Sequence, residues 1–346
     1  MRFEDVHIAG LAHLLPERVV TSEALETELA PLYDRLRLRV GRLELMSGVR
    51  ERRHAEPGTR PSELAAAAGR AALDDAGVRA DEIGCLVHAS VCRDFLEPAT
   101  ASVVHRALGL PASARAFDLS NACLGFVDAL TVVGAMVDRG DIAYGLVVAG
   151  EDGGPLVRRT IEHLLGTEGI GKAELKRAFA SLTIGSGAAA AVVSRRDGLR
   201  GGFGARLVGG ATGADSSAVE LCQGDTTEGG APLMETDSEA LLVAGCALAA
   251  RTWPGLLDEL DWSRERVDRV VTHQVGVAHR RALLAALELD PAIDFPTVEF
   301  LGNVGSVALP ATLDLARRDG FVAAGQRVAL LGIGSGLQCT MLGLET

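Results

Sequence analysis

The stretch IGSGAAAAVVSR, residues 184–195, has an echo near the end of the chain, IGSGLQCTMLGLE, residues 333–345. Each copy follows an apolar stretch and leads into another apolar run that is typical of a buried strand. A second pair, DEIGCLVHAS at 81–90 and RVDRVVTHQV at 266–275, precedes them in the same order and aligns one histidine with another. Two echoes in one order indicate that the chain is built from a duplicated unit.

Around these echoes, helical and strand patterns alternate. Residues 62–76 are rich in alanine, begin after Pro61 and stop at Gly77, which predicts a helix. Further strands are predicted at 83–91, 115–119 and 144–149, and a further helix at 124–139. Continuous apolar strands separated by helices indicate a sheet that is covered on both faces, and therefore an α/β fold.

The two units are expected to be joined by a loop-rich connection. Residues 196–230 are rich in Gly, Ser, Thr and Asp and show no clear period. We therefore predict a first half over residues 1–195, a connection over 196–230 and a second half over 231–346.

The composition excludes several classes of protein. The chain has 346 residues, with 34 Lys and Arg against 46 Asp and Glu, a formal net charge of −12. Nucleic acids and anionic membranes require dense cationic surfaces, so neither is an expected partner. The first residues contain no basic leader, and the most apolar run, 240–250, is too short to cross a bilayer as a helix. Six cysteines without a CxxC pair predict free thiols, no metal site and a cytoplasmic protein.

The segment FDLSNACLGFVDAL, residues 117–130, places Cys123 at a turn between a short strand and a helix that begins near Leu124. A thiolate there faces unpaired N–H groups and the positive end of the helix dipole, so we expect a lowered pKa. The small neighbours Ala122 and Gly125 leave room for a substrate carbonyl. On position alone, a small buried cysteine without a chemical role is the alternative.

Two other motifs contain polar residues at strand ends. His273 ends a predicted strand in VVTHQVGVAH, residues 270–279, and Asn303 lies between two glycines in LGNVGSVALPATL, residues 301–313. Each residue alone is more often structural than catalytic, and His279 is not at a metal-ligand spacing from His273. One Cys, one His and one Asn at strand ends together supply a nucleophile and hydrogen-bond donors for an oxyanion.

The glycine-rich segment GIGSG, residues 332–336, resembles a weak nucleotide-binding loop. It leads into a strand rather than a helix, so a dinucleotide cofactor is not expected. Glycines in a hairpin allow backbone N–H groups to point into a cavity, and the amide of Ser335 is a candidate for an oxyanion hole.

NACLGF around Cys123, HQV at His273, GNVG around Asn303 and the terminal GIGSG resemble the thiolase superfamily, and within it the ketoacyl synthase III group. SGVRERRHA, residues 47–55, is similar to an early SGxxERR pattern of that group. The resemblance covers essentially the whole chain. It implies a thiolase fold, in which duplicated halves form five layers in the order αβαβα, and a homodimer.

One segment indicates a branch within that group. SVCRDFLEPATAS, residues 90–102, resembles a loop of the long-chain head-to-head condensing enzymes that begin bacterial olefin and β-lactone pathways. The opening segments 8–26 and 31–36 are similar to the same enzymes. Glu97 matches their proposed catalytic base, which in that family reaches the active site of the other subunit. From sequence alone, a solvated loop carboxylate is the alternative for Glu97.

The resemblance implies a non-decarboxylative Claisen condensation of two fatty acyl-CoA thioesters to a 2-alkyl-3-ketoacyl product, released as a β-keto acid. Cys123 would carry the first acyl group, with its oxyanion held by the backbone amides of Cys123 and Ser335. His273 and Asn303 would stabilise the enolate that forms as Glu97 removes the α-proton. Removing an unactivated α-proton requires a base, and an apolar acyl channel would raise the pKa of a carboxylate toward that task.

Coenzyme A thioesters are substrates in this interpretation, and no separate cofactor is implied. Arg50, Arg52 and Arg53 are candidate contacts to the CoA phosphates, and a solvated charged loop is the alternative for them. A reductase, a β-lactone synthetase and an α/β-hydrolase are implied as partners only through the pathway.

Three other functions remain open on the sequence. A decarboxylative ketoacyl-carrier-protein synthase III would use a malonyl thioester, and would need no base because loss of CO₂ creates the carbanion. A papain-like cysteine hydrolase also uses Cys, His and Asn, but the strand-turn-helix setting of Cys123 fits it poorly. A non-catalytic acyl-binding subunit commonly lacks the nucleophile, whereas this chain has Cys123.

Overall fold

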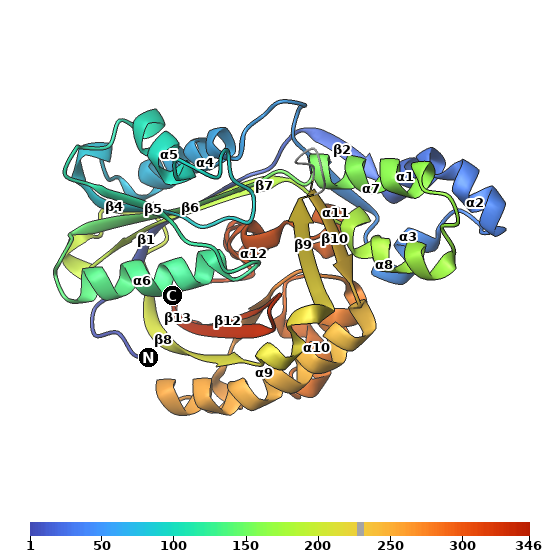
Figure 1. Ribbon diagram of the computed structural model, residues 1–346. Helices are drawn as coiled ribbons and strands as arrows, with labels where there is room; N and C mark the ends of the chain where they lie inside the picture. Colours follow the sequence, from blue (N-terminus) through green and yellow to red (C-terminus); the bar gives the residue numbers. More distant parts are fainter. Residues whose placement is uncertain (227–231) are drawn as a thin grey trace.

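The computed structural model describes residues 1–226 and 232–346, and within them a nine-stranded mixed sheet forms the centre of the molecule (Figure 1). In sheet order its strands are β11 (Arg269–Thr272), β12 (Arg327–Gly334), β13 (Gln338–Glu345), β8 (Ala205–Ala214), β1 (His7–Leu14), β7 (Gly187–Ser194), β6 (Tyr144–Glu151), β4 (Ile83–His88) and β5 (Arg115–Asp118). β1 and β8 pair only at His7 with Arg206 and at Ile8 with Ala205. The sheet therefore divides at this junction into two halves.

The two half-sheets repeat the same pairing pattern. Outward from the junction, β1, β7, β6 and β4 correspond to β8, β13, β12 and β11. In both halves the first two pairs are antiparallel and the third is parallel. The two IGSG stretches lead into β7 and β13, which occupy equivalent places. This is the arrangement that a duplicated unit predicts.

Helices complete five layers, which confirms the expected αβαβα order (Figure 1). The outer face of the first half-sheet is covered by α4 (Pro61–Ala76) and α5 (Thr100–Leu108). The central layer contains α6 (Gly125–Asp138) and α12 (Ala308–Arg318), and α9 (Ser238–Leu260) and α10 (Val277–Ala286) form the other outer layer. The expected helix at 62–76 is α4, and Gly77 ends it in the left-handed conformation.

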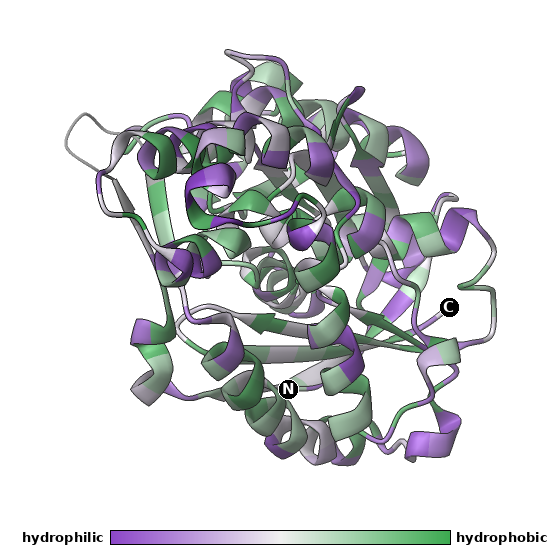
Figure 2. Ribbon diagram, turned by 90° about the vertical axis from the view of Figure 1, so that its right-hand side faces the viewer, coloured by the Kyte–Doolittle hydropathy of each residue, from purple (hydrophilic) through white to green (hydrophobic). Residues whose placement is uncertain are grey.

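Alternate side chains of each central strand enter different cores. On β6, Leu146 and Val148 pack in the cluster under α4, whereas Val147 and Ala149 pack in the cluster around α6 and α12. A strand that is buried on both faces reads as a continuous apolar run, which is why sequence pattern locates these strands. In Figure 2 the strands are correspondingly mostly hydrophobic, while the helices alternate hydrophobic and hydrophilic residues.

A smaller helical lobe lies beside the sheet, at the right of Figure 1, and has its own apolar cluster. Its helices are α1 (Ser22–Glu28), α2 (Ala30–Leu36), α3 (Arg42–Ser47), α7 (Gly154–Gly166) and α8 (Lys172–Leu182). The remaining described elements are two ribbons, β2 (Arg18–Thr21) with β3 (Glu51–His54) and β9 (Cys222–Thr226) with β10 (Pro232–Thr236), and α11 (Val298–Leu301). Short 3₁₀ helices are η1 (Ala80–Glu82), η2 (Arg196–Gly198), η3 (Ser216–Leu221), η4 (Arg264–Arg266), η5 (Pro291–Ile293) and η6 (Gly305–Val307).

The expected loop-rich connection at 196–230 contains a full strand of the sheet, β8, which is a correction. Its glycines allow close backbone packing rather than forming a loop. A Cβ atom on Gly209 would lie 2.4 Å from the Met1 carbonyl oxygen, and one on Gly210 would lie 2.3 Å from that of Met341. Residues 227–231, where the second half was expected to begin, lie outside the described residues, and the half boundaries stay a prediction.

The apolar run at 240–250 belongs to a longer helix than the sequence indicated. α9 has 23 residues and is long and apolar enough to cross a bilayer by length and composition alone. It packs along β8 and β13, and Leu248, Trp253 and Leu256 are buried in the core on that side. We therefore interpret α9 as a core helix of the outer layer.

A buried carboxylate, Asp314, fixes α12 against β1. Asp314 is fully buried, and its Oδ2 lies 2.6 Å from His13 Nδ1 and accepts a hydrogen bond from Arg318 Nε at 2.8 Å. Its Oδ1 accepts from Arg317 Nε at 3.0 Å. Burial alone would raise the pKa of Asp314, but these donors hold the pKa below its ordinary value.

Asp314→Asn should lower the free energy of unfolding by roughly 3 kcal/mol at pH 7, because an amide cannot accept all these bonds and leaves cations without their partner. Because the folded-state pKa is depressed, the stabilisation is present above the unfolded pKa of about 4 and is lost as the pH falls through the folded pKa. Urea denaturation at several pH values measures both effects. Asp319→Asn, at an exposed position on the same helix end, is the control; an equal loss in both variants would contradict the role of Asp314.

Candidate active site

Cys123 lies in a tight turn directly before α6. Leu124 is the residue at which the helix is capped, and its N–H donates to the Asn121 carbonyl at 2.9 Å. Ala122 has a φ of 46°, in the left-handed region that costs a residue with a side chain about 1 kcal/mol or more. The backbone is therefore strained at the residue immediately before the candidate nucleophile.

The environment of the Cys123 thiol differs from the sequence prediction. Burial, together with smaller contributions from the charges of Glu151 and Cys222, raises the pKa of the thiol to about 12. The lowered pKa expected from the helix N-terminus is therefore wrong, because desolvation and a nearby carboxylate raise the pKa of this half-buried residue. At neutral pH Cys123 is a thiol, and it must lose its proton as it attacks.

The hairpin between β12 and β13 packs against the residue that follows the nucleophile. A Cβ atom on Gly332 would lie 2.6 Å from Leu124 Cδ2, and one on Gly334 would lie 3.0 Å from Leu124 Cγ. The glycines of GIGSG thus allow the hairpin to approach the turn of Cys123. Ser335, in the same hairpin, donates its hydroxyl to Cys222 Sγ at 3.2 Å. Because Cys222 acts on the pKa of Cys123, Ser335 belongs to the same neighbourhood.

His273 follows β11 and extends its parallel pairing with β12. Its N–H donates to the Leu331 carbonyl at 2.9 Å, which places it next to Gly332 of the hairpin. Burial, together with a smaller contribution from His279, lowers the pKa of His273 to about 4. Its Nδ1 is buried and has no partner among the described atoms. His273 is therefore a neutral imidazole at pH 7, which is able to take up a proton or to donate a hydrogen bond.

Asn303 lies between α11 and η6 in a loop that the first IGSG stretch holds. Its N–H donates to the Thr183 carbonyl at 3.0 Å, and its carbonyl accepts from Gly185 N–H at 2.9 Å. Asn303 Oδ1 accepts from Gly305 N–H at 3.0 Å, which orients the side-chain amide. This leaves the Nδ2 group as its hydrogen-bond donor for a ligand.

Gln274 connects the His273 and Asn303 segments, and its role was missed in the sequence. Its Oε1 accepts from the backbone N–H groups of Thr297 and Val298, both at 3.1 Å, at the start of α11. Its Nε2 donates to the Thr272 carbonyl at 2.9 Å. The HQV motif contains this residue, but only the burial of its amide between two loops identifies the function. Glu151, at the end of β6, was also missed in the sequence.

Glu97 is exposed on the segment between β4 and α5. Three apolar side chains of the same segment are exposed as well: Val91 at 51%, Phe95 at 40% and Leu96 at 93%. The structure therefore brings Cys123, Ser335, His273 and Asn303 into one region, and among the described residues Glu97 forms no hydrogen bond or ion pair with any of them.

The three arginines that were predicted to contact CoA phosphates differ in burial and in hydrogen bonding. Arg52 is fully buried and donates to the Val20 carbonyl at 3.2 Å and to Ser22 Oγ at 3.0 Å. Burial lowers its pKa to about 10. Arg52 therefore stabilises the fold, and its assignment to CoA phosphates is wrong. Arg53 points to the other face and donates to the Glu17 carbonyl at 3.2 Å, while Arg50 is exposed.

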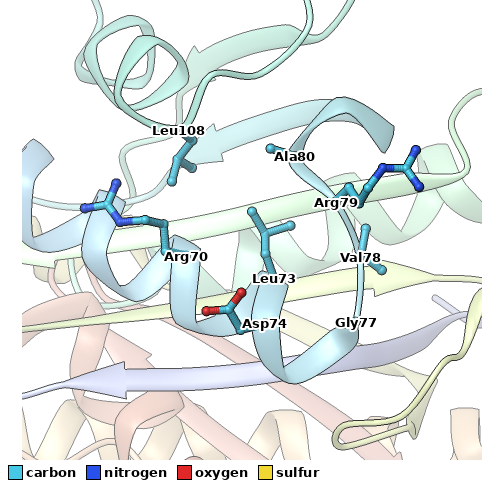
Figure 3. Close-up of a pocket in the computed structure, with 8 residues that line it drawn as sticks. All are labelled: Arg70, Leu73, Asp74, Gly77, Val78, Arg79, Ala80 and Leu108. Atoms are coloured by element: carbon cyan, nitrogen blue, oxygen red, sulfur yellow. The ribbon is translucent and has the colours of Figure 1, made fainter.

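A separate surface hollow of about 470 Å³ lies at the end of α4 (Figure 3). Its lining consists of Arg70, Leu73, Asp74, Gly77, Val78, Arg79, Ala80 and Leu108. None of the candidate residues lines it, and it contains neither a cysteine nor a histidine. It is therefore not the site of the chemistry. Across residues 1–226 and 232–346, no three His, Cys, Asp or Glu side chains are grouped as metal ligands.

The chain is similar to known proteins over nearly all of its length. The family model for the C-terminal part of 3-oxoacyl-[acyl-carrier-protein] synthase III matches residues 257–345. The chain is 37% identical to an acyl-CoA:acyl-CoA alkyltransferase of Shewanella oneidensis, with 100% of each chain covered. It is 36% identical to one of Xanthomonas campestris, covering 99% of this chain and 98% of that protein. It is 31% identical to a β-ketoacyl-[acyl-carrier-protein] synthase III of Bordetella petrii, covering 95% and 94%.

Solved structures give the same result. Cerulenin-bound OleA of Xanthomonas campestris is similar with a TM-score of 0.94 and 36% identity, covering 100% of this chain and 98% of that chain. An OleA variant of the same organism with bound lauric acid and lauroyl-CoA has a TM-score of 0.93 and 35% identity, covering 99% and 100%. The backbone of this chain therefore follows those structures over its whole length.

Proposed function

The chain belongs to the thiolase-fold, ketoacyl synthase III-like family, in the branch named acyl-CoA:acyl-CoA alkyltransferases, and from this we propose that it condenses two fatty acyl-CoA thioesters head to head. It is an acyltransferase of the condensing type. The product is a 2-alkyl-3-ketoacyl group released as a β-keto acid, the first intermediate of long-chain olefin or β-lactone biosynthesis. The observation that carries this conclusion is the full-length similarity to two alkyltransferases.

In the first half-reaction, Cys123 takes the acyl group of one acyl-CoA. Its sulfur forms a bond with the thioester carbonyl carbon, and the bond from that carbon to the sulfur of coenzyme A breaks. The thiol proton passes to the neutral imidazole of His273 and from there to the departing thiolate. The backbone amides of Cys123 and Ser335 stabilise the oxyanion between these steps. Both groups are neutral at pH 7, so the proton leaves the thiol only as the sulfur bonds to the carbonyl carbon.

In the second half-reaction, the α-carbon of another acyl-CoA attacks the acyl group on Cys123. Its thioester carbonyl accepts hydrogen bonds from His273 and from Asn303 Nδ2, which stabilise the enolate. The partner subunit's Glu97 removes the α-proton, because no CO₂ is lost to supply the electron pair. The new carbon–carbon bond forms as the bond to Cys123 Sγ breaks, and hydrolysis of the remaining thioester gives the acid.

A homodimer is part of this proposal. Val91, Phe95 and Leu96 expose apolar surface on the segment that carries Glu97. A second copy of the chain would cover this surface and receive Glu97 in its own site. This arrangement explains why a carboxylate with a catalytic role is exposed in the single chain.

Local arginines bind coenzyme A in this proposal, because the net charge of −12 on the whole chain repels its phosphates. Arg50 is the best placed of the three candidates. Its side chain is exposed, and its N–H donates to the Glu299 carbonyl at 2.9 Å in α11, which leads to Asn303. Arg53 is a weaker candidate because its guanidinium is bonded to a backbone carbonyl. We place the enzyme in the cytoplasm, without a separate cofactor and with a reductase, a β-lactone synthetase or an α/β-hydrolase as pathway partners.

A single experiment tests the proposed function. Purified protein incubated with one defined long-chain acyl-CoA should release one coenzyme A for each acyl group and form the 2-alkyl-3-keto acid, identified by mass spectrometry. A ketone that forms only after addition of a malonyl thioester would instead establish a decarboxylative ketoacyl synthase III. The match at 257–345 and the Bordetella petrii relative favour that second candidate, but it is less supported than the first.

A further inference from the structure

Glu151 is a buried carboxylate at the end of β6, and the mechanism above does not use it. Its exposure is 4%. Its Oε1 accepts from Val91 N–H at 3.0 Å and from the N–H and hydroxyl of Ser306 at 3.2 and 2.7 Å. Its Oε2 accepts from Cys92 N–H at 3.0 Å. No Lys, Arg or His of the described residues forms an ion pair with it, so four neutral hydrogen bonds stabilise the charge in place of water.

These bonds join two segments that the second half-reaction uses in different sites of the proposed dimer: the Asn303 loop serves its own chain, and the Glu97 segment serves the partner subunit. Val91 and Cys92 begin the segment that carries Glu97, and Ser306 lies in η6, directly after the loop of Asn303. At Gly305 the backbone has a φ of 54°, and a Cβ atom would lie 2.9 Å from Glu151 Oε1. The chain therefore allows the carboxylate to approach the Asn303 loop closely.

The same carboxylate acts on the nucleophile. Its charge raises the pKa of Cys123, after burial, which places Glu151 within electrostatic range of the thiol. Glu151 is thus within electrostatic range of the acyl-carrying sulfur of its own chain, and it is bonded to the Asn303 loop and to the segment that carries Glu97.

We propose that Glu151 is a positioning residue for the condensation step at both sites of the dimer, because its carboxylate holds the Asn303 loop in the site of its own chain and fixes the start of the segment that carries Glu97 to the partner subunit's site. This inference deepens the proposed function and rests on it. Enolate formation requires the base of one subunit and the hydrogen-bond donor of the other to meet one substrate, and a shift of about 1 Å in such a geometry costs on the order of 100-fold in rate. Acylation of Cys123 uses neither Glu97 nor Asn303.

Two substitutions separate the bridging role of Glu151 from its charge. Glu151→Gln removes the charge and turns an NH₂ group toward a backbone N–H, so one loop loses its acceptor. Glu151→Asp keeps the charge but is one methylene shorter, so it cannot bond to both loops in the same way. Ser306→Ala removes only the hydroxyl bond at 2.7 Å and leaves the fold least disturbed. Glu162→Gln, at an exposed position on α7, is the matched control.

The experiment compares acylation and condensation in each full-length variant. Intact-protein mass spectrometry after mixing with acyl-CoA reports the acyl adduct on Cys123, and product analysis reports the keto acid. For Glu151→Gln and Glu151→Asp we expect acylation within about threefold of wild type, condensation reduced about 100-fold and accumulation of the adduct. Ser306→Ala should show the same pattern with a loss of about tenfold, and Glu162→Gln should match wild type.

Iodoacetamide alkylation of Cys123 supplies a readout that a merely structural role would not change. Its pH profile should move to lower pH in Glu151→Gln, because the carboxylate no longer opposes the thiolate, and should keep its place in Glu151→Asp. Condensation at the wild-type rate in Glu151→Gln would overturn the inference. Equal losses of acylation and condensation in Glu151→Asp and Ser306→Ala would also overturn it. Wild-type enzyme that forms the adduct but no keto acid would contradict the proposed function, and the positioning role with it.

Discussion

Cys123→Ala is expected to abolish both half-reactions, with a loss of about 10⁴-fold or more in product formation. No other described group replaces the sulfur, because the acyl chain must stay bound to the protein while the second acyl-CoA loses its proton. The free thiol is protonated at neutral pH, so its reactivity depends on proton transfer during the attack rather than on a preformed thiolate. Release of coenzyme A and the mass of the protein after incubation with acyl-CoA measure the loss.

Cys222 provides the control for this variant. It is the neighbouring thiol that affects the pKa of Cys123, and its Sγ accepts the hydroxyl proton of Ser335. Cys222→Ala should keep the acyl adduct on Cys123 and lose less than about tenfold in rate. An adduct on Cys222 in the Cys123→Ala protein would contradict our assignment of the nucleophile.

The sequence predicted the repeated architecture well because the pattern that carries it is local. Strands such as β6 and β7 are buried on both faces, so nearly every residue is apolar, and α4 is bounded by Pro61 and Gly77. β8 was not predicted because its glycines pack against backbone that lies far away in sequence, from Met1 and Met341. No short stretch of sequence around residue 209 reveals these long-range contacts.

The candidate site was likewise predicted only in part from the sequence. Cys123, His273 and Asn303 stand in recognisable motifs, but the pKa of Cys123 depends on Glu151 and Cys222, which come from other elements. The role of Arg52 depends on the register of β3, because a period of two sends one of two adjacent arginines inward. Sequence identifies the residue types that the chemistry needs, whereas burial and long-range contacts decide their charge.

Glu97→Ala should leave acylation of Cys123 intact and reduce condensation by about 10³-fold or more, because the α-proton of an acyl thioester is not acidic enough to leave without a base. Mass spectrometry should show the acyl adduct at the wild-type level, and product analysis should show almost no keto acid. Glu56→Ala, which removes another exposed carboxylate, is the control and should retain condensation. Unchanged product formation in Glu97→Ala would remove this residue from the mechanism.

Mixed dimers decide which subunit Glu97 serves. A dimer of one Cys123→Ala chain and one Glu97→Ala chain contains a complete site only if Glu97 acts across the interface, since the chain with Cys123 then receives the base from the other subunit. Each parent variant is inactive in condensation, so restored product must come from the mixed species. If the chains assort at random after co-expression, activity should reach roughly a quarter of wild type, because half of the dimers carry one working site of two. No recovery, with mixed dimers verified by differential tags, would place Glu97 in the site of its own chain. That result would contradict our explanation that Glu97 is exposed in the single chain because it serves the other subunit.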